Sequence, residues 1–270
     1  PAKDAKYEFE IPHATHSEAI QAVLSLLDAG HGVIKSASEI DAVGHRVVHG
    51  GEKFASSVRI TDEVMAALEE CIPLAPSTSR QHHRHQACEK VMPGVPMVGV
   101  FDTAFHQTMP AKSYIYALPY EFYEQDKVRR YGFHGTSHKY VSQRAAAMLG
   151  KPAEELKLIS ATGNGSSVTA IDGGKSVDTS MGFTPLAGLP RHPLRDIDAG
   201  ILEYLMNKHG YDIKEMLNIL NKKSGVLGIS GVSSDFRDLE DAAPKGNQRL
   251  SALDSFEYGV IKLIGSYAAA

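Results

Sequence analysis

Residues 156–179 read LKLISATGNGSSVTAIDGGKSVDT, a stretch in which short apolar segments alternate with glycine-containing turns. We interpret residues 156–159, 166–171 and 175–179 as three β-strands, because each is rich in aliphatic or β-branched residues and is bounded by turn formers. The sequence Asp172-Gly173-Gly174 is typical of the tight turn of a β-hairpin. The stretch therefore predicts a hairpin that is preceded by a third strand.

Helical patterns flank these strands on both sides. Apolar residues recur at helical spacing, which predicts helices at residues 17–29, 62–72, 138–149, 199–209, 212–222 and 247–270. Thr15 and Glu18 could form a capping box at the first of these helices, and Thr61 is the predicted N-cap of the second. Two further apolar stretches predict strands at residues 40–49 and 95–101. Strands mixed with helices of this length indicate an α/β fold. We place a boundary near Gly150-Lys151-Pro152, which gives a first α/β domain at residues 1–150 and a second at 151–270.

The composition is that of an ordinary globular protein, with 43% hydrophobic and 22% charged residues among 270. A formal net charge of −4 gives no reason to expect nucleic acid as a partner, and no apolar stretch is as long as a membrane span. Cys71 and Cys88 do not suggest a disulfide framework. We therefore expect a cytoplasmic protein that contacts neither nucleic acid nor a membrane.

A turn with the sequence ATGNGSS, residues 161–167, lies between the first two predicted strands. Gly163 and Gly165 would let backbone N–H groups approach an anion closely, as the phosphates of a ligand require. The same residues fit a plain Asn-Gly hairpin turn that binds no ligand. Taken alone, they leave both interpretations open.

The sequence YGFHGTSH, residues 131–138, immediately precedes a predicted helix. A histidine near a helix N-terminus, here His134, can offer an imidazolium and N–H donors to a charged ligand. The alternative is an ordinary N-terminal turn with incidental histidines. In either case Ser137 is the predicted N-cap of the helix.

Two predicted strands carry a charged residue at or near their ends. Arg46 lies in the sequence HRVVHGG, residues 45–51, and its planar guanidinium suits a carboxylate or a phosphate. Asp102 follows the strand at 95–101, and the ends of strands in α/β sheets are where ligands and metals tend to bind. The alternatives are a strand-end salt bridge for Arg46 and a helix N-cap for Asp102.

Together these segments resemble the acetate kinase family. The resemblance extends over nearly the whole chain and is carried by GHRVVHGG at 44–51, VFDTAFH at 100–106, YGFHGTSH at 131–138, GNGSS at 163–167, DTSMGFTPL at 178–186 and SDFRD at 234–238. It implies the sugar-kinase/Hsp70/actin type of fold, in which two related α/β domains close on a nucleotide. It also implies Mg²⁺, ATP or ADP and acetate as ligands, and direct in-line phosphoryl transfer from ATP to a carboxylate.

The resemblance also implies roles for individual residues. The catalytic residues would be Arg46 at the carboxylate and the transferring phosphoryl group, His134 as a donor to that group, and Asp102 beside the magnesium. The nucleotide would contact Gly163, Asn164, Gly165, Asp235, Phe236 and Arg237. The pocket for the acetate methyl group would be lined by Val48, Phe133 and Pro185.

The sequence departs from the family pattern in several places. We expect the chain to be part of a longer protein, without the serine-rich turn and the later glycine-containing loop that handle phosphate in the family, and therefore inactive by itself. Residues 77–86, 161–162 and 190–195 also differ from the family pattern and each looks one residue short. We hypothesise that these three stretches reflect reading-frame errors.

Two other functions remain open. One is a related enzyme, such as a propionate kinase or another short-chain acyl kinase. The other is a non-catalytic, actin-like nucleotide-binding protein, which the three altered stretches would favour if they are genuine. The resemblance further implies a homodimer.

Overall fold

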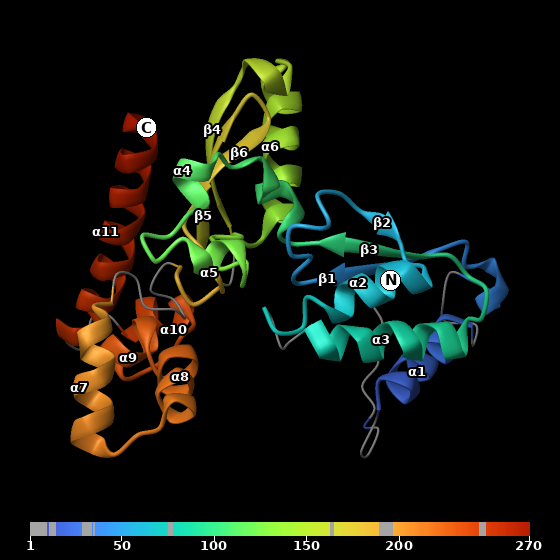
Figure 1. Ribbon diagram of the computed structural model, residues 1–270, viewed down its shortest axis with the longest axis horizontal. Helices are drawn as coiled ribbons and strands as arrows, with labels where there is room; N and C mark the ends of the chain where they lie inside the picture. The colour runs from blue at the N-terminus through green and yellow to red at the C-terminus, as the bar shows by residue number, and fades with distance from the viewer. Residues whose placement is uncertain are drawn as a thin grey trace. The chain divides into compact units, whose positions relative to one another are not determined.

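The computed structural model describes residues 10, 15–28, 34, 36–74, 78–162, 165–188, 197–242 and 247–270. It combines helices with two three-stranded sheets, which confirms the predicted α/β class (Figure 1). Two compact units are present, Pro1–Ala104 and Phe105–Ala270. The predicted boundary at residue 150 differs from this division because helix α6, Gly135–Leu149, packs on the second sheet. A compact unit need not coincide with a domain, so the domains 1–150 and 151–270 stay a prediction.

The sheet of the first unit has the order β1-β3-β2. Strand β1, Val43–Val47, pairs in parallel with β3, Met97–Phe101, while β2, Val58–Arg59, pairs antiparallel with β3. The two longer strands fall inside the stretches predicted at 40–49 and 95–101. Val47 and Phe101 pack with Phe54 and Leu68 in a buried cluster, so the same residues that form the strands also anchor the sheet.

The helices of the first unit are α1, His16–Asp28, α2, Asp62–Glu69, α3, Thr78–Val91, and the 3₁₀ helix η1, Ala37–Glu39. The Thr15 N–H donates to the Glu18 carboxylate and the Glu18 N–H donates to Thr15 Oγ1, which confirms a capping box at α1. Thr61 caps α2 as predicted. Helix α3 was not predicted, because its sequence lacks an apolar stripe over the first two turns.

The sheet of the second unit is an antiparallel meander in the order β4-β5-β6. Its strands are β4, Lys157–Thr162, β5, Ser167–Asp172, and β6, Lys175–Thr179. Gly173 and Gly174 have positive φ values of 58° and 75° between β5 and β6, which confirms the predicted hairpin turn. Helix α6 lies along β4 (Figure 1).

The other helices of the second unit precede α6, separate it from β4 or follow β6. Those before β4 are η2, Ala104–Thr108, which begins at the unit boundary, α4, Ala111–Tyr114, α5, Glu121–Glu124, and η3, Ala153–Glu155. The C-terminal helices are α7, Ala199–His209, α8, Ile213–Lys222, α9, Gly225–Ser230, α10, Phe236–Ala242, and α11, Asn247–Ala269. Val226, Leu239 and Ala252 bring α9, α10 and α11 together in a buried cluster. No helix in the described part of the chain is long and apolar enough to cross a membrane.

The altered stretches have different outcomes in the structure. Ala161 and Thr162 complete β4, where they pair with Val168 and Ser167. Residues 78–86 belong to α3, while residues 190–195 lie outside the described residues. The reading-frame hypothesis therefore stays a prediction.

Two glycines with similar backbone angles allow a matched test of packing. Gly132 has φ +76°, and a Cβ there would lie 2.6 Å from Thr179 Cγ2 and 2.7 Å from His106 Cδ2. Gly150 has φ +64°, with no such atom within 4 Å. Alanine at Gly150 should cost about 1 kcal/mol through backbone strain alone. Alanine at Gly132 adds overpacking and should cost about 3 kcal/mol or more.

Urea unfolding of the intact protein would measure both changes. Equal losses of unfolding free energy in Gly132→Ala and Gly150→Ala would contradict the close packing around Gly132.

Candidate active site

Arg46 and Asp102 form an ion pair across two parallel strands of the first unit. Arg46 is opposite Val100 in the register of β1 and β3, so the first residue after β3 can meet its side chain. Arg46 Nε donates to Asp102 Oδ1 at 3.2 Å and to Oδ2 at 3.1 Å, and Nη2 also donates to Oδ2. This bonding raises the pKa of Arg46 above its ordinary value. The guanidinium is therefore both charged and held in a fixed plane.

The two partners of this pair differ sharply in exposure. The side chain of Arg46 is 66% exposed and that of Asp102 is 3% exposed. Within the described residues, the hydrogen bonds of the Arg46 guanidinium all go to Asp102 through Nε and Nη2. Its remaining N–H donors, which include both hydrogens of Nη1, are available to an external anion. A strand-end salt bridge and an anion-binding arginine are thus not exclusive alternatives here.

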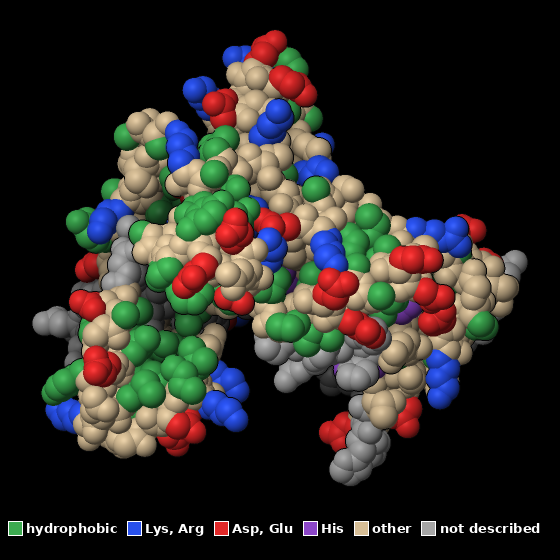
Figure 2. Space-filling view, viewed as in Figure 1, with side chains coloured by type: hydrophobic (Ala, Val, Ile, Leu, Met, Phe, Trp, Pro, Cys, Tyr) green, Lys and Arg blue, Asp and Glu red, His purple; other side chains and the backbone are tan. Residues whose placement is uncertain are grey.

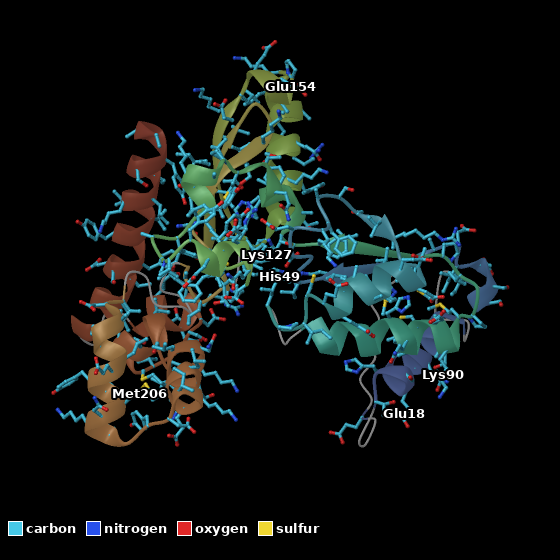
Figure 3. The ribbon with its side chains drawn as sticks, in the orientation of Figure 1. Glu18, His49, Lys90, Lys127, Glu154 and Met206 are labelled. Carbon is cyan, nitrogen blue, oxygen red and sulfur yellow. The ribbon has the colours of Figure 1, made fainter. Side chains whose placement is uncertain are left out.

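The loop that follows β1 is fixed by buried polar contacts. The Gly51 N–H donates to Nδ1 of His49 at 3.0 Å, and the Gly50 N–H donates to Thr103 Oγ1 at 3.2 Å. His49, labelled in Figure 3, is fully buried, and burial lowers its pKa to about 4. These contacts tie the ends of β1 and β3 together beside the Arg46–Asp102 pair.

His134 occupies the N-cap position of α6 with a left-handed backbone, φ 59° and ψ 27°. The predicted N-cap, Ser137, is wrong, because the helix already begins at Gly135. A non-glycine residue with positive φ is uncommon and is found with some preference at functional sites. The conformation directs the His134 ring toward β5, where its Nδ1 lies 2.8 Å from Ser167 Oγ.

Ser167 connects His134 to a second, buried histidine. Its Oγ is 2.8 Å from Nε2 of His138, and Nδ1 of His138 is 3.0 Å from Ser160 Oγ. His138 is fully buried, and burial is the main reason that its pKa is lowered to about 3. His138 is therefore neutral at physiological pH. Its ring has one N–H, which can donate to only one of the two serines, and one acceptor nitrogen for the other.

Another buried histidine, His106, lies beside this line of hydrogen bonds, with its ring centroid 5.8 Å from that of His138. Nε2 of His106 donates to the Phe133 carbonyl oxygen at 3.1 Å, and Nδ1 lies 2.8 Å from Ser176 Oγ. Burial lowers the pKa of His106 to about 4, so the ring is neutral and Ser176 is the donor to Nδ1. The bond to Phe133 fixes the backbone immediately before His134.

The turn at residues 131–134 packs against residues 179–182. Both the Tyr131 and the Gly132 N–H groups donate to the Gly182 carbonyl oxygen at 3.2 Å. The Phe183 N–H donates to the Tyr116 hydroxyl at 2.8 Å, and a Cβ on Gly182 would collide with that hydroxyl. The Thr179 carbonyl oxygen accepts from Arg130. The family-like segments 131–138 and 178–186 are thus directly bonded to one another.

The remaining predicted residues have varied surroundings. Gly165 lies beside His134, with an added Cβ 3.6 Å from the ring Nε2, whereas Gly163 and Asn164 lie outside the described residues. Asp235 receives two hydrogen bonds from the Arg237 guanidinium, and Phe236 meets Phe256 edge to face. The predicted methyl-pocket residues differ in exposure: Val48 is half-buried, Phe133 is buried and Pro185 is exposed.

These residues fall into two groups. Arg46, Val48 and Asp102 belong to the first compact unit, and His134 with the predicted nucleotide residues belongs to the second. A common cleft between them stays a prediction. Sequence reasoning missed Ser167, His138 and Ser160, although two signals were present. His134 and His138 are four residues apart on a helix, and hydroxyl side chains alternate along the strands at 160, 162, 167 and 169.

Asp102 is the predicted metal ligand. Within the described part of the chain, no group of three or more His, Cys, Asp or Glu side chains could hold a metal ion. Mg²⁺ is commonly held by one or two carboxylates together with substrate phosphates and water. A single carboxylate such as Asp102 fits that pattern but does not require a metal.

Residues 2–270 match the acetokinase family, and the chain belongs to this family. The chain is 61% identical over 265 residues to an acetate kinase of Desulfitobacterium hafniense strain DSM 10664 / DCB-2, covering 96% of this chain and 66% of the relative. It is 58% identical over 275 residues to an acetate kinase of Natranaerobius thermophilus, covering 100% and 69%. The chain thus spans about two thirds of the length of these curated relatives.

Solved structures agree with this membership. The Porphyromonas gingivalis acetate kinase has a TM-score of 0.90 at 50% identity, covering 94% of this chain and 65% of that one. A propionate kinase from Francisella tularensis has a TM-score of 0.88 at 40% identity, covering 96% and 67%. The predicted fold class is therefore confirmed by structures as well as by secondary structure.

Proposed function

We propose that the protein of which this chain forms a part transfers the γ-phosphoryl group of ATP to acetate. The observation that carries the proposal is Arg46, whose exposed guanidinium is fixed in plane by the buried carboxylate of Asp102. Family membership and the acetate kinases at about 60% identity support this reading. In the reaction, a carboxylate oxygen of acetate forms a bond to the γ-phosphorus as the bond to the ADP oxygen breaks. No proton is transferred.

The residues would share this work by charge and position. Arg46 would neutralise charge on the acetate carboxylate and on the phosphoryl group in flight, where preorganised donors are most effective. His134 would donate a hydrogen bond to the same phosphoryl group. Gly163, Asn164 and Gly165 would cradle the nucleotide phosphates, and Asp235, Phe236 and Arg237 would border the adenosine. Mg²⁺ bound near Asp102 would supply further positive charge.

Three finer proposals accompany this one. Val48, Phe133 and Pro185 would surround the acetate methyl group and disfavour longer acids by crowding. A cytoplasmic location rests on the reduced state expected for Cys71 and Cys88. A homodimer rests on the family resemblance and on exposed apolar side chains of α7 and α8, where Figure 2 shows hydrophobic side chains gathered on the surface. The exposed apolar residues of these two helices include Ile201, Tyr204, Ile213 and Leu217.

The test is an assay of acyl phosphate formation by the intact protein. The assay supplies ATP, Mg²⁺ and either acetate or propionate, and traps the acyl phosphate as its hydroxamate. We expect acetyl phosphate from acetate, and kcat/KM for propionate about 10-fold lower, because one extra methylene group changes kcat/KM by about 10-fold or somewhat more. Preference for propionate would favour the related short-chain acyl kinase, to which the 40% identical propionate kinase gives some support. Nucleotide binding without acyl phosphate from either acid would favour the non-catalytic alternative.

A further inference from the structure

Four side chains of the second unit form one continuous line of hydrogen bonds. Ser160 Oγ meets Nδ1 of His138 at 3.0 Å, Nε2 of His138 meets Ser167 Oγ at 2.8 Å, and Ser167 Oγ meets Nδ1 of His134 at 2.8 Å. Ser167 and His138 are fully buried and Ser160 is 6% exposed. We call this line the serine–histidine relay. Each hydroxyl and each neutral imidazole has one polar hydrogen, and this limit constrains the direction in which hydrogen bonds are donated along the relay.

The direction is set at the Ser160 end. In the described residues, the one side-chain hydrogen bond of the Ser160 hydroxyl is to His138 Nδ1. A buried hydroxyl hydrogen without an acceptor is costly, so Ser160 donates and Nδ1 of His138 accepts. His138 is neutral and has a single N–H. That hydrogen must therefore be on Nε2, which donates to Ser167.

The remaining bonds follow at Ser167. Its oxygen accepts from His138, and Thr162 Oγ1, at 3.3 Å, can either donate to it or accept from it. A serine hydroxyl has one hydrogen and two acceptor positions. The contact with Nδ1 of His134, at 2.8 Å, is shorter than the contact with Thr162 Oγ1, at 3.3 Å, and we therefore assign the Ser167 hydrogen to His134. If His134 donated to Ser167, Ser167 to His138 and His138 to Ser160, the Ser160 hydrogen would have no side-chain acceptor among the described residues.

We propose that Ser167 is a positioning residue that holds neutral His134 with its proton on Nε2. Cε1 and Nε2 of the His134 ring are 3.5 Å and 3.6 Å from where a Cβ on Gly165 would be, so the edge that carries Nε2 faces the predicted phosphate turn. The proposal rests on the proposed function, in which His134 donates to the phosphoryl group. The relay would give His134 a permanent N–H donor on that edge without requiring a charged ring.

The test reads the proton position directly, by ¹⁵N NMR of the imidazole nitrogens in the intact protein at about pH 9, where an ordinary imidazole is neutral. The titratable side chains placed against His134 among the described residues are His138 and His106, both neutral. We expect His134 to be the Nε2–H tautomer in the wild type and a tautomer mixture in Ser167→Ala. His134 carrying its proton on Nδ1 in the wild type would overturn the proposal, whatever the variants do.

A matched control is Ser176→Ala, which removes a fully buried serine that bonds His106 at the same distance of 2.8 Å. It should leave the His134 tautomer unchanged, and the same tautomer mixture in both variants would contradict a specific role for Ser167. Ser167→Ala should also lower kcat for acetyl phosphate formation by about 10-fold to 100-fold, as typical supporting residues do. A tautomer change without a kcat change would leave the relay intact and instead contradict the proposed role of His134 in transfer.

Discussion

Arg46→Ala in the intact protein is expected to lower kcat/KM for acetyl phosphate formation by about 10³-fold or more, because preorganised charge at a transferring phosphoryl group has effects of that size. The affinity for nucleotide should be retained, since the predicted nucleotide residues belong to the other compact unit. Arg46→Lys should lose most of the activity as well, because a lysine keeps the charge but lacks the planar fork that Asp102 holds.

The control for this experiment is Lys53→Ala in the same compact unit. Lys53 pairs with Glu70 on the surface, where both side chains are exposed and an ion pair contributes little. Its replacement should leave kcat/KM unchanged. Steady-state kinetics with acetate and a separate nucleotide-binding titration would distinguish the outcomes. An Arg46→Ala enzyme with normal kcat would exclude Arg46 from the phosphoryl transfer.

Acid is expected to destabilise the protein steeply between about pH 6.5 and pH 4. Burial lowers the pKa of His49 and His106 to about 4 and that of His138 to about 3. Each ring is neutral in the folded protein, whereas an unfolded histidine takes up its proton near pH 6.5. As the pH falls through this window the unfolded state binds more protons, so stability is lost, and the loss levels off below the folded pKa values.

The expected slope is about 1.4 kcal/mol per pH unit for each histidine, or about 4 kcal/mol per pH unit for the three together. Urea unfolding at several pH values would measure it. His138→Gln removes one titrating ring and should make the slope shallower by about 1.4 kcal/mol per pH unit. Stability that stays constant from pH 6.5 to pH 4.5 would contradict the burial of these histidines in neutral form.

Elements with strong local signals could be predicted from the sequence. The β5–β6 hairpin followed from Asp172-Gly173-Gly174, because positive φ at two successive residues is a demand that glycines meet. The cap of α2 followed from Thr61 for a similarly local reason. The pairing of Arg46 with a carboxylate was foreseen only as an alternative, since its partner Asp102 is far away in sequence.

Features that depend on tertiary contacts could not be predicted. The left-handed conformation of His134 has no signal in its own stretch of sequence, and the partner of its ring, Ser167, lies in a separate strand of the second sheet. Helix α3 lacks an apolar stripe over its first turns, yet its last turns bury Cys88 against Met92 and Met97. The relay itself joins a helix to two strands, and no single stretch of sequence contains it.

The two sheets differ in how far apart their paired residues lie along the chain. In the second unit, Thr162 pairs with Ser167 and Asp172 with Lys175, so these strands can meet after closing very short loops. In the first unit, Val43 pairs with Met97, so the long segment between them must be closed into a loop. The conformational entropy of that segment is lost before packing contacts can compensate for it. The meander that carries Ser167 is therefore expected to pair early in folding, whereas Arg46 is expected to meet Asp102 only after the slower, long-range pairing of β1 with β3.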